Sequence, residues 1–147
     1  MSGKSGARHR SGLRLVPAVE RATHAVGVYL QTDARFGCTQ AEANVLAFLY
    51  ARDGSPLSEL HASFGHRRST LTSVIDRLEQ RSLVVRERDP QDGRAFNLAL
   101  TRAGAATARA VTSHLRALEQ RAASRVTEGD IEGFLEVARA LADAAQR

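Results

Sequence analysis

The chain has 147 residues, of which 43% are hydrophobic, which excludes an intrinsically disordered protein and fits one compact unit with an added dimerisation element. It has no apolar run near the roughly 20 residues that span a bilayer and no apolar secretory leader, so a cytoplasmic location is expected. Its 21 Lys and Arg residues outnumber 16 Asp and Glu residues, which favours a polyanionic partner.

The first residues, MSGKSGARHRSG, are rich in Gly and Ser and contain basic but no acidic residues. Such a composition buries little apolar surface, so residues 1–14 are expected to form a flexible basic arm. A helix is predicted from about Pro17 to Ala34, because Pro suits a first turn and apolar residues recur at helical spacing behind it. We assign residues 15–36 to an N-terminal dimerisation helix.

The next stretch carries the signals of three helices. Thr39 and Glu42 form a capping box before AEANVLAFLYA, which is apolar nearly all round and is expected to be a central buried helix. Ser55 and Pro56 are expected to open a short helix as its N-cap and first residue. After Gly65 a further helix, RRSTLTSVIDRLEQR, is expected to turn its apolar residues inward and its polar residues outward.

After Ser82 the hydrophobic period changes to two residues. LVVRER and RAFNLAL are therefore expected to be strands of a hairpin, joined by a turn over residues 89–93 that contains Pro and Gly. In the second strand, one face is expected to be buried, and its residues are Phe96, Leu98 and Leu100.

Two helices are expected to complete the chain. Thr101 is expected to cap a long helix that continues to about Ser124, and Thr127 is expected to start the last helix. The last helix carries an apolar stripe of Ile131, Phe134, Leu135, Ala138 and Leu141. The apolar surface of such stripes is larger than one small domain can bury, so residues 101–147 are expected to be C-terminal dimerisation helices.

This order of helices and hairpin is typical of a winged helix-turn-helix, a mainly α fold with a small β-hairpin wing, which we place at residues 37–100. In this arrangement a recognition helix enters the major groove of double-stranded DNA, and the hairpin reaches the neighbouring minor groove. The expected DNA-binding side chains lie on the polar face of the recognition helix and in the hairpin turn, and they are Arg68, Ser69, Thr72, Ser73, Arg77 and Arg94.

The stretch from Ser69 to Thr101, STLTSVIDRLEQRSLVVRERDPQDGRAFNLALT, resembles the core signature of the multiple-antibiotic-resistance regulator (MarR) family. The similarity covers a recognition helix of the form S-T-x-T-x-x-x-D-R-L-E, a wing turn D-x-R-[A/S] and a strand that ends in L-T. Ser82 departs from the family's usual glycine, a change that is expected to cost little, and Ser73 stands where arginine is frequent.

The resemblance implies a homodimeric transcription regulator that binds a pseudo-palindromic operator. It also implies that Arg94 enters the minor groove and that Asp92 holds it in position, and Arg67 and Thr70 join the expected DNA-binding residues. Members of the family are mostly repressors that a small, often aromatic or anionic, effector releases from DNA. Other members respond to cysteine oxidation or zinc.

Two alternatives remain open. Cys38, the only cysteine, precedes a predicted helix start where a thiolate is favoured, so a redox-responsive regulator is one of them. A winged-helix module for protein contacts without DNA binding is the other. No enzymatic activity, cofactor or metal is expected, because hydrolase and phosphate-loop motifs are absent and the histidines are widely spaced. A composite zinc site of Cys38, Glu42 and His114 is the one metal site considered.

Overall fold

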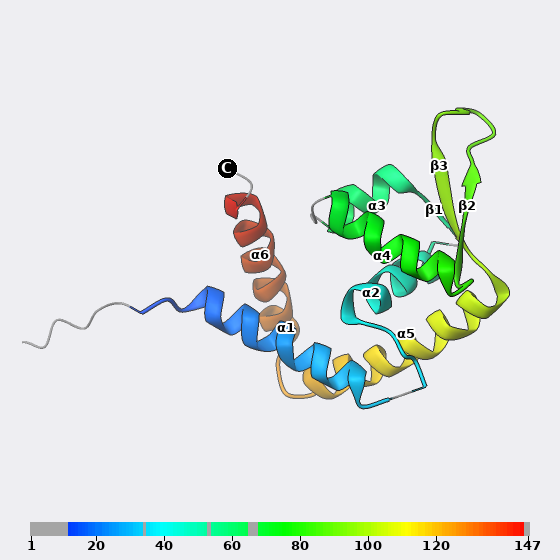
Figure 1. Cartoon of the computed structure of the whole chain (residues 1–147). Coiled ribbons are helices and arrows are strands. Elements are labelled where there is room, and N and C mark those ends of the chain that lie inside the picture. The colour runs from blue at the N-terminus through cyan, green and yellow to red at the C-terminus, as the bar shows by residue number, and fades with distance from the viewer. Residues whose placement is uncertain (1–11, 34, 53, 65–67, 146–147) are drawn as a thin grey trace, which may run out of the picture.

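The computed structural model describes residues 12–33, 35–52, 54–64 and 68–145, and these form six helices and a three-stranded sheet (Figure 1). The helices are α1 (Leu15–Gln31), α2 (Gln40–Tyr50), α3 (Leu57–Phe64), α4 (Arg68–Gln80), α5 (Arg102–Ala123) and α6 (Glu128–Ala145). The strands are β1 (Ser55–Pro56), β2 (Val84–Arg88) and β3 (Phe96–Leu100), in the sheet order β1-β3-β2. The predicted fold class is confirmed: a winged helix-turn-helix between long terminal helices.

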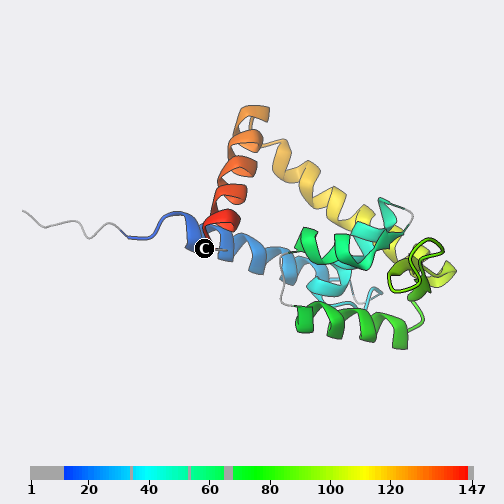
Figure 2. The ribbon, with the colours of Figure 1, turned by 90° about the horizontal axis from the view of Figure 1, so that it is seen from above.

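Helix α2 is the central helix of the fold, as predicted. The Glu42 N–H donates to Thr39 Oγ1 at 3.3 Å, and the Thr39 N–H donates to Glu42 Oε2 at 2.9 Å, which completes the capping box. Both α4 and α5 pack against this helix, and Figure 2 shows them on opposite sides of it. The main core joins α2, α3, α4 and the sheet through Leu46, Leu49, Leu60, Leu71, Ile75, Leu78 and Leu98.

Ser55 and Pro56 do not open a helix, so that prediction is wrong. They form β1, which pairs antiparallel with Asn97 and Leu98 of β3, and α3 begins at Leu57. The partner strand lies far along the sequence, so no local signal reveals the pairing. Proline is tolerated there because an edge strand does not need every backbone N–H in the ladder.

The hairpin of β2 and β3 forms the wing, which rises away from the body of the molecule (Figure 1). Asp89 Oδ1 shapes its turn by accepting hydrogen bonds from the N–H groups of Gln91 at 2.7 Å and Asp92 at 3.2 Å. These backbone donors hold the pKa of Asp89 below its ordinary value. Leu98 is buried as predicted, whereas Phe96 is 38% exposed, because it lies at the outer end of the hairpin, beyond the core.

The base of the wing is attached to α5. Thr101 caps α5, since its Oγ1 accepts from the Gly104 N–H at 2.9 Å, and the same hydroxyl donates to the Ser82 carbonyl at 2.7 Å. Ser82 itself has a φ of 55°, in the left-handed region that favours glycine. Serine in place of the family's usual glycine therefore carries some conformational strain, because the left-handed region disfavours residues with a Cβ atom.

The terminal helices α1 and α6 extend beyond the core. Leu30 near the end of α1 is buried against Phe36, Ala43 and Val111, which attaches this helix to the body. Helix α6 has no buried residue, and Phe134 and Leu135 are more than half exposed. In the described part of the chain, no helix has the length and apolar character that crossing a membrane requires.

Candidate nucleic-acid interface

The core packing of α4 determines which of its residues face solvent. Leu71, Val74, Ile75 and Leu78 are buried, so the opposite side of the helix is exposed. Arg68 is the first residue of α4, whereas Arg67 lies outside the described residues. The other expected DNA-binding residues of this helix are all exposed: Ser69, Thr70, Thr72, Ser73 and Arg77.

Short hydroxyl side chains dominate this exposed face. The Ser73 hydroxyl donates to the Ser69 carbonyl at 3.0 Å, which holds the serine side chain close to the helix. A helix with such short side chains can approach base edges closely in a major groove. The face is therefore suited to contact with a DNA duplex.

Arg77 lies at the edge of this face and has a second contact that the sequence analysis missed. Its Nε donates to Glu42 Oε1 at 3.0 Å, and the Glu42 side chain is buried at the start of α2. Arg81, one turn further on, also reaches Glu42, at 3.4 Å. A glutamate at this place in a capping box signals a helix start, but nothing local indicates two distant arginine partners, one on α4 and one just after it.

The wing is attached to α4 by a second group of charges. Arg86 of β2 donates to Asp76 Oδ1 at 2.6 Å and lies 2.8 Å from Glu79 Oε2. Both carboxylates project from α4. This contact sets the position of the wing relative to the recognition helix, because one guanidinium bridges the two elements.

At the wing turn, Asp92 and Arg94 are both exposed. Asp92 Oδ1 accepts from the backbone N–H of Arg94 at 3.0 Å, so the aspartate orders the turn and does not hold the guanidinium. The Arg94 side chain forms no hydrogen bond or ion pair with the residues that the structure describes. It is thus available to an external anion.

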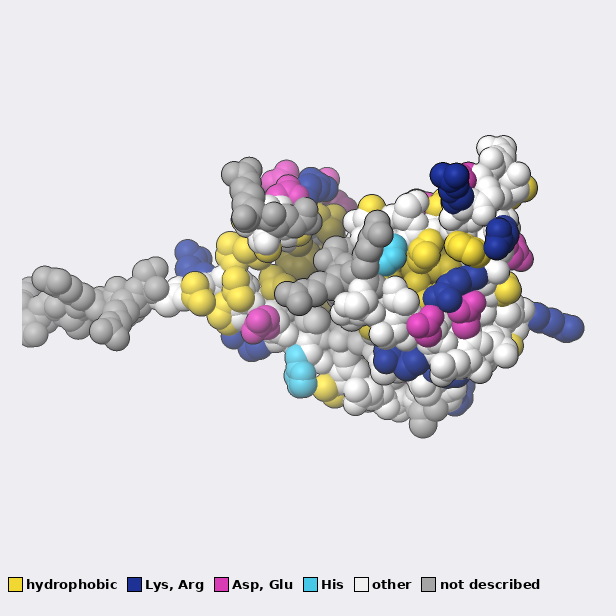
Figure 3. Space-filling model, turned by 45° about the horizontal axis from the view of Figure 1, so that its top comes forward, with side chains coloured by type: hydrophobic (Ala, Val, Ile, Leu, Met, Phe, Trp, Pro, Cys, Tyr) yellow, Lys and Arg dark blue, Asp and Glu magenta, His cyan; other side chains and the backbone are white. Residues whose placement is uncertain are grey.

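The surface colours of Figure 3 separate two regions of the molecule. Arginine side chains project from the wing at the right, next to the exposed face of α4. Hydrophobic side chains gather at the left, over the beginning of α1 and beside α6. Charged side chains also occur at the left and hydrophobic ones beside the wing, but the apolar surface at α1 and α6 and the arginines of the wing suit two different kinds of partner.

The electrostatic expectation for Cys38 is wrong. Burial raises the pKa of this half-buried thiol, and Arg81 beside it lowers the pKa by less. The thiolate is disfavoured because the surrounding protein replaces water, and the nearby Glu42 carboxylate adds to this effect.

The three residues considered for zinc have other contacts. Glu42 binds Arg77 and Arg81, and the His114 ring stacks on Tyr29 with the ring centroids 4.1 Å apart. Among the described residues, no group of three or more His, Cys, Asp and Glu side chains lies close enough together to hold a metal ion.

The comparison with known proteins agrees with this geometry. The sequence profile of the MarR family matches residues 38–96, which extend from just before α2 to the first residue of β3. The HTH-type transcriptional repressor MdtR of Bacillus subtilis (strain 168) is 30% identical over 117 residues, which cover 80% of this chain and 76% of MdtR.

Solved structures have the same fold. S. aureus MepR in a complex with DNA matches with a TM-score of 0.76 and 23% identity, over 91% of this chain and 99% of MepR. The transcriptional regulator PcaV from Streptomyces coelicolor, in complex with its natural ligand, matches with a TM-score of 0.73 and 27% identity, over 99% of each chain.

Proposed function

This chain belongs to the MarR family and is a DNA-binding transcription regulator rather than an enzyme; from this premise we propose that it is a homodimeric repressor that a small-molecule effector releases from a pseudo-palindromic operator. In this proposal residues 37–100 bind DNA, residues 15–36 and 101–147 form the dimer, and residues 1–14 are a basic arm.

One observation carries the DNA-binding part of the proposal: α4 has an exposed polar face, and the wing, which Arg86 links to α4, carries the exposed Arg94, whose side chain has no hydrogen bond or ion pair with the described residues. The recognition helix supplies Ser69, Thr72 and Ser73 for base edges, and the wing supplies Arg94 for the minor groove. Arg67, Arg68, Thr70 and Arg77 complete the contact surface, with Asp92 as the residue that orders the turn.

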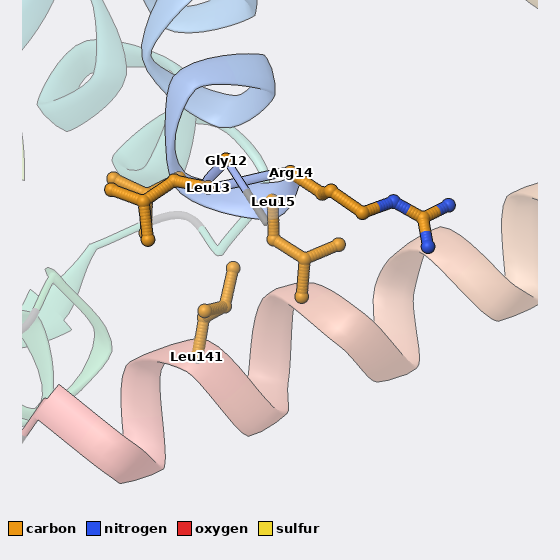
Figure 4. Close-up of a pocket in the computed structure, with 6 residues that line it drawn as sticks. Gly12, Leu13, Arg14, Leu15 and Leu141 are labelled. Atoms are coloured by element: carbon orange, nitrogen blue, oxygen red, sulfur yellow. The ribbon is translucent and has the colours of Figure 1, made fainter. Parts of the chain in front are cut away.

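The apolar surface of the terminal helices supports the homodimer. Leu15 is 50% exposed and Phe134 is 55% exposed, although both lie on amphipathic helices. Figure 4 shows Leu15 of α1 and Leu141 of α6 pointing into the space between these helices, where an open hollow of about 590 Å³ lies. A second copy of the chain would bury this surface, as symmetric dimers do.

Repression and effector release rest on the relatives. MdtR is a transcriptional repressor, and PcaV has a natural ligand in its structure. In a dimer, two recognition helices about 34 Å apart read successive major grooves. A small aromatic or anionic effector that favours another spacing lowers operator affinity by a population shift.

The test is fluorescence anisotropy with the intergenic DNA upstream of the protein's own gene, measured over a salt series and against a scrambled duplex. We expect preference for the upstream DNA and a steep negative salt dependence, with a slope near 0.9 for each phosphate neutralised. Flat, weak binding to both duplexes would overturn the proposal and favour the module for protein contacts.

A matched pair of variants tests the wing. Arg94→Ala is expected to weaken binding by about 1–3 kcal/mol, because it removes the exposed cation at the wing turn. Arg109→Ala removes another exposed arginine, from α5 on the other side of α2, and is expected to change affinity little. Equal effects of the two variants would contradict the role of Arg94.

A further inference from the structure

Among the described side chains of the proposed DNA-contacting face, Arg77 is the one that is also tied to a buried carboxylate. We propose that Glu42 is a positioning residue for DNA binding: it holds the guanidinium of Arg77 by one edge, so that the opposite edge meets a DNA phosphate. This inference rests on the proposed function, and it assigns a role to a residue of α2, which supplies none of the expected DNA contacts.

The Glu42 carboxylate is held in a fixed position. The residue is only 3% exposed, and its Oε2 accepts a hydrogen bond of 2.9 Å from the backbone N–H of Thr39. The carboxylate therefore cannot move toward solvent without breaking the capping box. Its other oxygen, Oε1, is directed at α4, where it receives the Arg77 Nε at 3.0 Å.

This geometry divides the Arg77 guanidinium into a bound edge and a free edge. The bond to Glu42 uses Nε, whereas Nη1 and Nη2 form no hydrogen bond with the described residues. The Arg77 side chain remains 51% exposed. An arginine anchored in this way presents its two terminal amino groups without the loss of rotamer freedom that a mobile side chain suffers on binding.

Arg81 does not share this role, although it contacts the same carboxylate. Its Nη1 donates to the Gly37 carbonyl at 2.9 Å and its Nη2 donates to the Phe36 carbonyl at 3.2 Å. These bonds occupy the terminal amino groups of Arg81, which donate to carbonyls of the loop between α1 and α2. Arg81 therefore compensates the buried charge of Glu42, and the charge of Arg77 remains available to a phosphate.

The surroundings also favour an anion at this place. Arg77, Arg81 and Glu42 line an open hollow of about 490 Å³ together with Thr39 and Gln80. Two guanidinium groups and one carboxylate leave a positive excess there. The hollow borders the exposed face of α4, where one strand of a duplex in contact with that face would pass.

The experiment compares Glu42→Gln, Arg77→Ala and the double variant in the full chain, with the upstream intergenic duplex as the probe. Glu42→Gln keeps the size of the side chain but removes its charge, so Arg77 is no longer held. We expect each single variant to bind about fivefold to tenfold more weakly, with a salt slope smaller by about 0.9, the value for one phosphate contact. The double variant is expected to bind no more weakly than Arg77→Ala.

Glu59→Gln is the matched control. Glu59 also lies in the first turn of a helix and also has an arginine partner, Arg52 at 3.5 Å, but it has no hydrogen bond or ion pair with the described residues of α4. This variant is expected to leave the salt slope unchanged. A thermal melt of each variant separates lost stability from lost contact, because a smaller folded fraction does not change the slope of the folded molecules.

The outcomes separate the two levels of the proposal. If the unmodified chain shows no salt-dependent binding, both the proposed function and the role of Glu42 are overturned. If Arg77→Ala reduces the slope while Glu42→Gln leaves it unchanged, or if the two effects add, only the positioning role is overturned. Tighter binding by Glu42→Gln would also overturn it, since the carboxylate would then merely repel DNA.

Discussion

Gly104, in the first turn of α5, lies so close to the carbonyl group of Leu83 that a Cβ atom at this position would overlap the Leu83 oxygen. The same oxygen accepts the backbone N–H of Thr101 at 3.1 Å. The base of the wing and the start of α5 are therefore in direct backbone contact, which only glycine permits.

Gly104→Ala is accordingly expected to lower the free energy of unfolding by about 3 kcal/mol, because neither backbone can retreat without breaking these hydrogen bonds. Urea denaturation measures the loss. Gly133→Ala is the matched control: it lies in α6 with no atom within 4 Å of the added Cβ, and alanine is expected to stabilise that helix by about 0.5–1 kcal/mol. Equal effects of the two changes would contradict the close contact.

Ser82→Gly is expected to stabilise the protein by about 0.5–1 kcal/mol, because the φ of 55° strains a side chain but not glycine. A rise in the midpoint of thermal unfolding would be the signature. Ser124→Gly provides the comparison, since Ser124 ends α5 with a φ of −66°, where glycine relieves no strain. A destabilised Ser82→Gly variant would show that the serine makes a compensating contact.

The bridge from Arg86 to Asp76 and Glu79 is expected to matter for binding more than for stability. The double change Asp76→Asn and Glu79→Gln removes two negative charges, which by simple electrostatics would strengthen DNA binding. We expect affinity to fall about fivefold instead, because the wing is no longer held at its angle to α4. The free energy of unfolding should change by less than about 1 kcal/mol, because Arg86 and its two carboxylate partners are partly exposed. Tighter DNA binding by this double variant, measured by fluorescence anisotropy, would show that the Arg86 bridge does not position the wing.

Acid is expected to weaken the start of α6 through Asp130. Hydrogen bonds from the Thr127 side chain and backbone, at 2.7 and 2.9 Å, hold the pKa of Asp130 below its ordinary value. A carboxyl whose pKa is lower in the folded state stabilises the fold above the unfolded pKa of about 3.9, and this stabilisation disappears as the pH falls through the folded pKa. Asp130→Asn should therefore have a lower melting temperature than the unmodified protein at pH 7, and the two melting temperatures should converge as the pH falls through the folded pKa of Asp130. A difference in melting temperature that stays constant with pH would contradict the role of the Asp130 carboxylate.

Local hydrogen bonds explain why much of the fold is predictable from the sequence. Thr39 and Glu42 are three residues apart, and so are Thr101 and Gly104, so each cap forms within its own segment. The hairpin turn closes through Asp89 and its next neighbours. The exposed face of α4 follows from helical periodicity alone. The resemblance of the stretch from Ser69 to Thr101 to a family signature then indicated which exposed residues are expected to face DNA.

Only the tertiary structure decided which distant groups meet. Glu42 and Arg77 are 35 residues apart, and Arg86 meets Asp76 across two different elements. The pairing of β1 with β3 and the burial around Cys38 likewise depend on how the elements pack. A sequence pattern records the spacing of side chains along one helix or strand, whereas these contacts depend on the position of one element relative to another, which the shared core around α2 determines.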